Sequence, residues 1–127
     1  MAVEQRMLVV DDEAVIVEEM IEVFDGRGFY CRGATSVDEA LALIREDPKI
    51  SLIVTDVKMP GKSGVDLMAE ARRIPGRQLV FIVATGHGGA TQKEALETQE
   101  VFKVLHKPVS LKALVESVRE GFQTLAA

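Results

Sequence analysis

Short apolar runs alternate along this chain with longer segments in which apolar residues recur every three to four positions. The short runs are typical of strands buried on both faces of a sheet, and the longer spacing is typical of helices with one buried face. The expected strands cover residues 7–10, 29–32, 52–55, 79–84 and 101–105. The pattern therefore predicts five strands, each followed by a helix.

Residues that start helices support this division of the chain. A serine or threonine followed three positions later by glutamate satisfies free backbone N–H groups at the first turn of a helix. Ser36 with Glu39 and Thr91 with Glu94 fit this pattern, and Ser110 is placed to cap the last helix. Helices are thus expected to begin near residues 36, 91 and 110.

Two of the expected strands carry a charged residue that a strand covered on both faces would bury. Arg32 lies in the second strand and Lys103 in the fifth, so we place these strands at the edges of the sheet. Strict alternation of strand and helix predicts parallel strands joined by right-handed crossovers. The sequence therefore predicts an α/β fold of the flavodoxin-like (βα)5 type. Its five-stranded, doubly wound parallel sheet has the order 2-1-3-4-5, in a single domain over residues 1–127.

Composition narrows the function classes. Hydrophobic residues make up 47% and charged residues 28% of the 127 residues, as in a globular domain. The net charge of −5 disfavours direct nucleic-acid binding, because such domains carry a basic surface. No apolar run approaches the roughly 18 residues that a membrane helix needs. The single cysteine, Cys31, cannot form an internal disulfide, so we expect a cytoplasmic protein.

Polar residues follow four of the strands at the point where each one ends. Asp11 and Asp12 follow the first strand, Asp56 the third, Thr85 the fourth and Lys107 the fifth. Because the carboxyl ends of parallel strands share one edge of the sheet, we expect these side chains to meet there. Carboxylates so close together repel one another unless a cation lies between them, and an oxygen-rich site suits Mg²⁺.

The other two groups suggest the chemistry of this site. A lysine ammonium neutralises phosphoryl charge, and a threonine hydroxyl can donate a hydrogen bond to a phosphoryl oxygen. A carboxylate beside them can act as the nucleophile in phosphoryl transfer and become an aspartyl phosphate. The residues around Asp56 therefore favour phosphoryl transfer to this carboxylate.

Four segments at the strand ends together resemble receiver domains of two-component response regulators, over essentially the whole chain. They are Leu-Val-Val-Asp-Asp-Glu (8–13), Val-Thr-Asp-Val-Lys-Met-Pro-Gly (54–61), Val-Ala-Thr-Gly (83–86) and His-Lys-Pro-Val (106–109). The resemblance implies a phosphoacceptor that takes its phosphoryl group from a histidine kinase or histidine phosphotransfer protein. It implies no enzyme activity beyond the domain's own phosphorylation and dephosphorylation.

The resemblance also implies a role for each site residue. It makes Asp56 the phosphoacceptor, Thr85 the hydrogen-bond donor to the phosphoryl group and Lys107 its charge partner. It implies a Mg²⁺ site formed by Asp11, Asp12, Asp56 and the backbone carbonyl of Lys58. It further implies a cis peptide bond between Lys107 and Pro108.

One position departs from the family pattern. Many receivers carry tyrosine or phenylalanine three residues before the active-site lysine, where this chain has Val104. Phe102 would project to the same face of the strand. Since Val104 has no ring to turn, we expect the signal to pass through the loop at residues 86–89 and the start of the fourth helix. The output surface would combine the fourth helix, fifth strand and fifth helix, facing an unknown partner or a missing effector domain.

Three other functions are compatible with parts of the pattern. A haloacid-dehalogenase-type phosphatase would need a second aspartate two residues after Asp56, where Lys58 stands. A flavin carrier of the same fold would need a phosphate-binding loop after the first strand, where Asp11 and Asp12 would repel phosphate. A degenerate receiver that only binds protein would not need all five site residues.

A structural alternative also exists for Asp11, which could simply cap the first helix.

Overall fold

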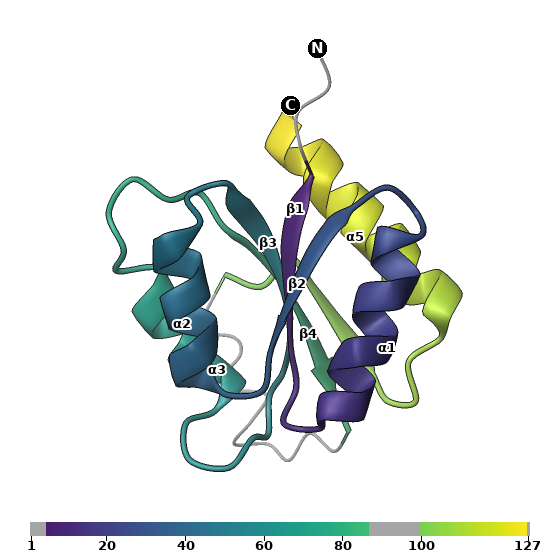
Figure 1. Cartoon of the computed structure of the whole chain (residues 1–127), viewed down its shortest axis with the longest axis horizontal. Coiled ribbons are helices and arrows are strands. Elements are labelled where there is room, and N and C mark those ends of the chain that lie inside the picture. Colours follow the sequence, from purple (N-terminus) through teal and green to yellow (C-terminus); the bar gives the residue numbers. More distant parts are fainter. Residues whose placement is uncertain (1–4, 87–99, 127) are drawn as a thin grey trace.

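The computed structural model describes residues 5–86 and 100–126 (Figure 1). The elements in chain order are β1 (Arg6–Val10), α1 (Ala14–Asp25), β2 (Tyr30–Ala34), α2 (Val37–Glu46), β3 (Ile50–Asp56), α3 (Gly64–Ala71), β4 (Val80–Thr85), β5 (Lys103–His106) and α5 (Leu111–Ala126). The loop expected at residues 86–89, beyond Gly86, and the helix expected to start at Thr91 lie outside the described residues.

The five strands form one parallel sheet in the order β2-β1-β3-β4-β5, as predicted. The two strands with a charged residue, β2 and β5, are its edges. Helices α1 and α5 cover one face, and α2 and α3 cover the other (Figure 1). No helix in the described part of the chain is both long and apolar enough to cross a membrane.

Alternate residues of the central strands supply the two halves of the core. In β1, Met7 and Val9 pack with α1 and α5, whereas Leu8 and Val10 pack with α2 and α3. Successive side chains of a strand point to opposite faces, so a strand covered on both sides must be apolar throughout. This explains why the apolar runs located the strands without any polar alternation.

The edge strand β2 extends further than the sequence pattern indicated. It was expected to end at residue 32, but it pairs with β1 as far as Ala34. Gly33 lies under α1, where a Cβ atom would overlap Cγ1 of Val17 and approach Cδ1 of Ile21 to 2.8 Å. The glycine therefore allows α1 to pack closely against the edge of the sheet. By contrast, β5 begins later than expected, at Lys103 rather than at residue 101.

Two of the expected helix starts are confirmed. The Ser36 hydroxyl accepts a hydrogen bond from the Glu39 backbone N–H, and the Ser110 hydroxyl accepts one from that of Ala113. Helix α3 begins with a full capping box between Ser63 and Asp66, which the sequence analysis missed. All three satisfy backbone donors that a helix start leaves free.

An ion pair connects the start of β1 to the end of α2. It lies at the amino ends of the strands, opposite the carboxyl ends. Arg6 donates to Oδ2 of Asp47 from Nη2 at 2.6 Å and from Nε at 3.0 Å. Burial of Asp47 acts to raise its pKa, but Arg6 and the Lys49 backbone N–H outweigh it and hold the pKa below its ordinary value. The carboxylate form of Asp47 therefore stabilises the fold.

We predict that Asp47→Asn lowers the free energy of unfolding at pH 7 by about 1–3 kcal/mol, the scale of hydrogen bonds to a charged group. Because the pKa is lowered by folding, this stabilisation is complete above the unfolded pKa, near pH 4, and is lost as the pH falls through the folded pKa. Urea unfolding of both proteins between pH 7 and pH 2 measures the difference. The control Asp38→Asn removes an exposed partner of Lys62 and should change stability by less than about 0.5 kcal/mol. A difference that persists at low pH would contradict the role given to the Asp47 charge.

Candidate functional site

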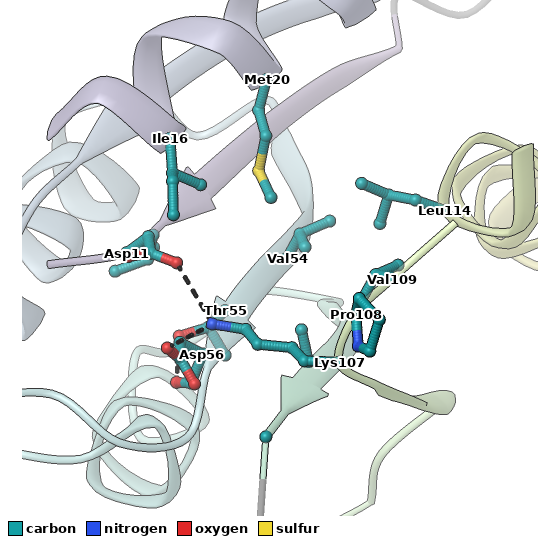
Figure 2. Close-up of a pocket in the computed structure, with 13 residues that line it drawn as sticks. Asp11, Ile16, Met20, Val54, Thr55, Asp56, Lys107, Pro108, Val109 and Leu114 are labelled. Atoms are coloured by element: carbon teal, nitrogen blue, oxygen red, sulfur yellow. Dashed lines mark hydrogen bonds and ion pairs between the residues drawn. The ribbon is translucent and has the colours of Figure 1, made fainter. Parts of the chain in front are cut away.

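The polar residues that follow the strands meet at the carboxyl edge of the sheet. Asp11 follows β1, Asp56 ends β3, Thr85 ends β4 and Lys107 follows β5. Asp11, Asp56 and Lys107 line one cavity, and Figure 2 shows their charged ends turned toward one another. The sequence-based prediction that these three side chains converge is thus confirmed by the geometry.

Lys107 connects the fifth strand to the carboxylates. Its ammonium group lies 2.9 Å from Oδ2 of Asp56 and 3.7 Å from Oδ2 of Asp11 (Figure 2). Partial burial acts to lower the pKa of Lys107, but the neighbouring carboxylates, Asp56 first, raise it above its ordinary value. Lys107 therefore carries its positive charge throughout the neutral pH range.

Asp11 is almost fully buried and has two roles. Its Oδ1 accepts a hydrogen bond from the Glu13 backbone N–H at 2.9 Å, at the start of α1, while Oδ2 faces Lys107. Asp11 therefore has a contact beyond the one at the start of the first helix. Burial, reinforced by the charges of Asp56 and Asp12, raises the pKa of Asp11 despite Glu13 and Lys107. The ionised form of Asp11 is therefore less favourable in the fold than in water.

Asp56 is held by backbone interactions on both sides. Its Oδ1 accepts from the Lys58 backbone N–H at 3.3 Å, and its carbonyl oxygen accepts from the Thr55 hydroxyl at 2.9 Å. A Cβ atom at Gly64 would overlap this same carbonyl, so only glycine lets α3 start so close to the acceptor. The sequence analysis did not predict this contact of Gly64.

Thr85 is buried at the end of β4. Its carbonyl oxygen accepts the backbone N–H of Lys107 at 2.8 Å, which fixes the start of the Lys107 loop to β4. The peptide bond between Lys107 and Pro108 is cis, as the family resemblance implied. Val104 and Phe102 are exposed, at 39% and 37% of their surface, on and just before the edge strand β5.

The carboxylates fit a hard metal ion. One oxygen each from Asp11, Asp12 and Asp56 lie within 4.8 Å of one another, with Asp11 buried and Asp12 exposed. Oxygen donors without nitrogen or sulfur suit Mg²⁺, and an open side leaves room for water and phosphoryl oxygens. The donor set that the structure brings together is thus suited to the predicted ion. The Lys58 carbonyl remains a predicted ligand.

The cavity at this site has a second, apolar part that the sequence analysis did not predict. Its volume is about 580 Å³, and its apolar walls come from α1, β3, α5 and the segment leading into α5. Ile16, Met20, Val54, Val109 and Leu114 line these walls (Figure 2). These residues lie far apart in the sequence, so no local pattern could have indicated that they line one cavity.

Comparison with known proteins assigns the chain to a family. Residues 7–119 match the model of the response regulator receiver domain. The two-component response regulator PprB of Pseudomonas aeruginosa is 28% identical over 116 residues, covering 88% of this chain and 42% of that protein. A response regulator receiver protein of Anaeromyxobacter sp. is 33% identical over 113 residues, covering 88% of this chain and 46% of that protein.

A solved structure shows the same fold. The crystal structure of a response regulator receiver protein from Pseudomonas putida matches with a TM-score of 0.87 and 32% identity, covering 94% of this chain and 99% of that one. This chain spans less than half the length of the two curated relatives described above. The family match, the sheet order and the residues gathered around Asp56 lead to one conclusion: the chain belongs to the receiver domains of two-component response regulators.

Proposed function

We propose that Asp56 accepts a phosphoryl group from a histidine kinase or histidine phosphotransfer protein, in a reaction that requires Mg²⁺. One observation carries the proposal: the Lys107 ammonium lies 2.9 Å from an Asp56 oxygen that shares its surroundings with two further carboxylates. The family interacts with histidine kinases, and its members are phosphoacceptors rather than classical enzymes. The buried free thiol of Cys31 suits a reducing compartment, so we place the reaction in the cytoplasm.

The reaction begins with attack of an Asp56 carboxylate oxygen on phosphorus. The bond between phosphorus and the donor's imidazole nitrogen breaks, its electron pair stays with the imidazole, and an acyl phosphate forms on Asp56. The carboxylate form of Asp56 is the nucleophile in this step. Its hydrogen bond from Lys58 holds one oxygen, which orients the side chain.

The groups around Asp56 have complementary roles in binding the phosphoryl group. Lys107 supplies positive charge to the transferred group, and the Thr85 hydroxyl donates a hydrogen bond to one of its oxygens. Asp11, Asp12, Asp56 and the Lys58 carbonyl would hold Mg²⁺, which neutralises phosphoryl charge when bound. Without a cation, the carboxylates alone would repel the incoming phosphate.

Phosphorylation would also change the pairing of Lys107. This residue follows β5, and its backbone N–H bonds to Thr85, so both strand ends adjoin the acceptor. We propose that the output surface comprises β5, α5 and the predicted fourth helix, which lies outside the described residues. It would face an unknown partner or a further effector domain.

We predict that Asp56→Asn abolishes phosphorylation, because an amide is not a nucleophile toward phosphorus. Purified protein, incubated with Mg²⁺ and either acetyl phosphate or a phosphorylated histidine kinase, should gain one phosphoryl group by intact-mass spectrometry. Asp38→Asn, an exposed aspartate away from the cavity, is the matched control and should label like wild type. Full labelling of the Asp56→Asn protein would rule out Asp56 as the acceptor.

A second prediction concerns the metal site. Asp12→Ala removes one of the three clustered carboxylates and should weaken Mg²⁺ binding by at least about tenfold, equivalent to roughly 1.4 kcal/mol. Isothermal titration with Mg²⁺ measures this affinity, and EDTA should stop phosphorylation of wild type without unfolding it. Equal affinities in wild type and variant would remove Asp12 from the site.

A third prediction concerns how the negative charge of Asp11 affects stability, tested with a variant whose side chain has nearly the same shape. Its raised pKa means that the ionised form costs stability, so the penalty is absent below the unfolded pKa and complete once the pH exceeds the folded pKa. Asp11→Asn keeps an oxygen for the Glu13 N–H and removes the charge. We therefore expect the metal-free variant to be more stable than wild type at pH 7.

The same variant should lose the stabilisation that Mg²⁺ gives wild type, which is about 1.4 kcal/mol at ten times the dissociation constant. Urea unfolding with and without MgCl₂, at matched ionic strength with NaCl, measures both effects. A metal-free variant less stable than wild type would show that Asp11 contributes mainly through its pairing with Lys107.

A further inference from the structure

The cavity beside Asp56 continues well past the groups that phosphoryl transfer requires. Its volume of about 580 Å³ lies within the range of about 300–1,000 Å³ that small-molecule sites occupy. Asp11, Asp56 and Lys107 form its charged end. A phosphoryl group alone would fill only this end and leave the apolar part open.

The rest of the cavity is apolar. Figure 2 shows Ile16 and Met20 extending from α1 and Leu114 from α5 toward the space above Val54. Val109 completes the wall next to Pro108. Within the described part of the chain, Asp11, Asp56 and Lys107 are the only charged residues that line the cavity.

This distribution of charge selects one kind of ligand. With Mg²⁺ at the three carboxylates, the Lys107 ammonium would favour an anion at the charged end. Among the described residues, the far walls carry no charged side chain to pair with a second ionic group. A sugar or nucleobase would bury its polar groups against Met20, Val54 and Leu114 without partners. The ligand that fits is an anion with a short apolar tail.

We propose that this cavity binds the acyl chain of small acyl phosphates, so that donors with longer acyl chains phosphorylate Asp56 better than acetyl phosphate does. The inference rests on the proposed function. An Asp56 oxygen attacks phosphorus, the bond between phosphorus and the acyl oxygen breaks, and the donor leaves as a carboxylate that keeps the electron pair. No oxidant, reductant or further reactant is needed.

The expected preference follows from the size of the tail. Each methylene moved from water to an apolar site contributes about 0.8 kcal/mol, which is about fourfold in a rate constant. Butyryl phosphate carries two methylenes more than acetyl phosphate. Wild type should therefore use butyryl phosphate with a kcat/KM about 15-fold higher, provided both methylenes are buried.

The test compares the two donors on the whole chain in the presence of Mg²⁺, with labelling followed by intact-mass spectrometry. Met20→Phe narrows the cavity and should bring the ratio of the two kcat/KM values close to one. Val15→Phe is the matched control, because Val15 is a neighbouring α1 residue that is 65% exposed and does not line the cavity. This control should keep the wild-type ratio.

A binding measurement that needs no phosphoryl transfer accompanies the kinetics. In the presence of Mg²⁺, butylphosphonate should shift the methyl resonances of Met20 and Leu114, and methylphosphonate should not. Equal use of both donors by wild type, with Asp56 labelled by each, would overturn the proposal and leave the proposed function intact. So would a Met20→Phe protein that is impaired only toward a phosphorylated histidine domain, since the cavity would then serve a protein partner.

If neither acyl phosphate nor a phosphorylated histidine kinase labels Asp56, the proposed function fails. The butylphosphonate shifts then decide whether the cavity binds apolar anions. Their absence would overturn the inference on its own.

Discussion

The structure depends on one electrostatic arrangement: the sheet brings carboxylates together, and Lys107 offsets only part of their repulsion. Parallel strands β1 and β3 are neighbours, so the residues that end them must lie side by side. The strand pairing therefore places Asp11 next to Asp56 even though both are carboxylates. Burial makes the ionised form of Asp11 unfavourable. Lys107 follows the edge strand β5, and its ammonium group lies 2.9 Å from Oδ2 of Asp56. Its positive charge offsets part of the repulsion between the carboxylates. The uncompensated remainder is what makes the site suited to a cation and then to a phosphoryl group.

Most of the fold could be predicted because each of its main features has a local cause. A strand buried on both faces must be apolar throughout, so runs such as residues 52–55 and 79–84 stand out in the sequence. Charges at Arg32 and Lys103 identified the edges, since only an edge strand leaves room for them. Once the strand order is known, the meeting of the residues that follow the strands is a geometric consequence.

The features that the sequence did not reveal depend on close approach between distant segments. Gly33 and Gly64 look like ordinary loop or strand glycines, yet each lies where a Cβ atom would overlap a neighbouring element. The sequence could not show that Asp11 contacts both the Glu13 N–H and Lys107, because the position of Lys107 depends on the fold. The apolar part of the cavity likewise requires the separation of α1 from α5, which no periodicity encodes.

The two sides of the site differ in how firmly they are held, and this difference bears on signalling. Asp56 ends a central strand that is buried nearly throughout, and Gly64 brings α3 against its backbone. Lys107 follows β5, a four-residue edge strand whose residues are mostly exposed. A segment with little buried apolar surface costs less to displace than a packed one. When phosphorylation changes the charge on Asp56, we therefore expect the carboxylate side to stay fixed. The Lys107 side should adjust, and its backbone bond to Thr85 links it to the end of β4, where the loop expected to carry the signal begins.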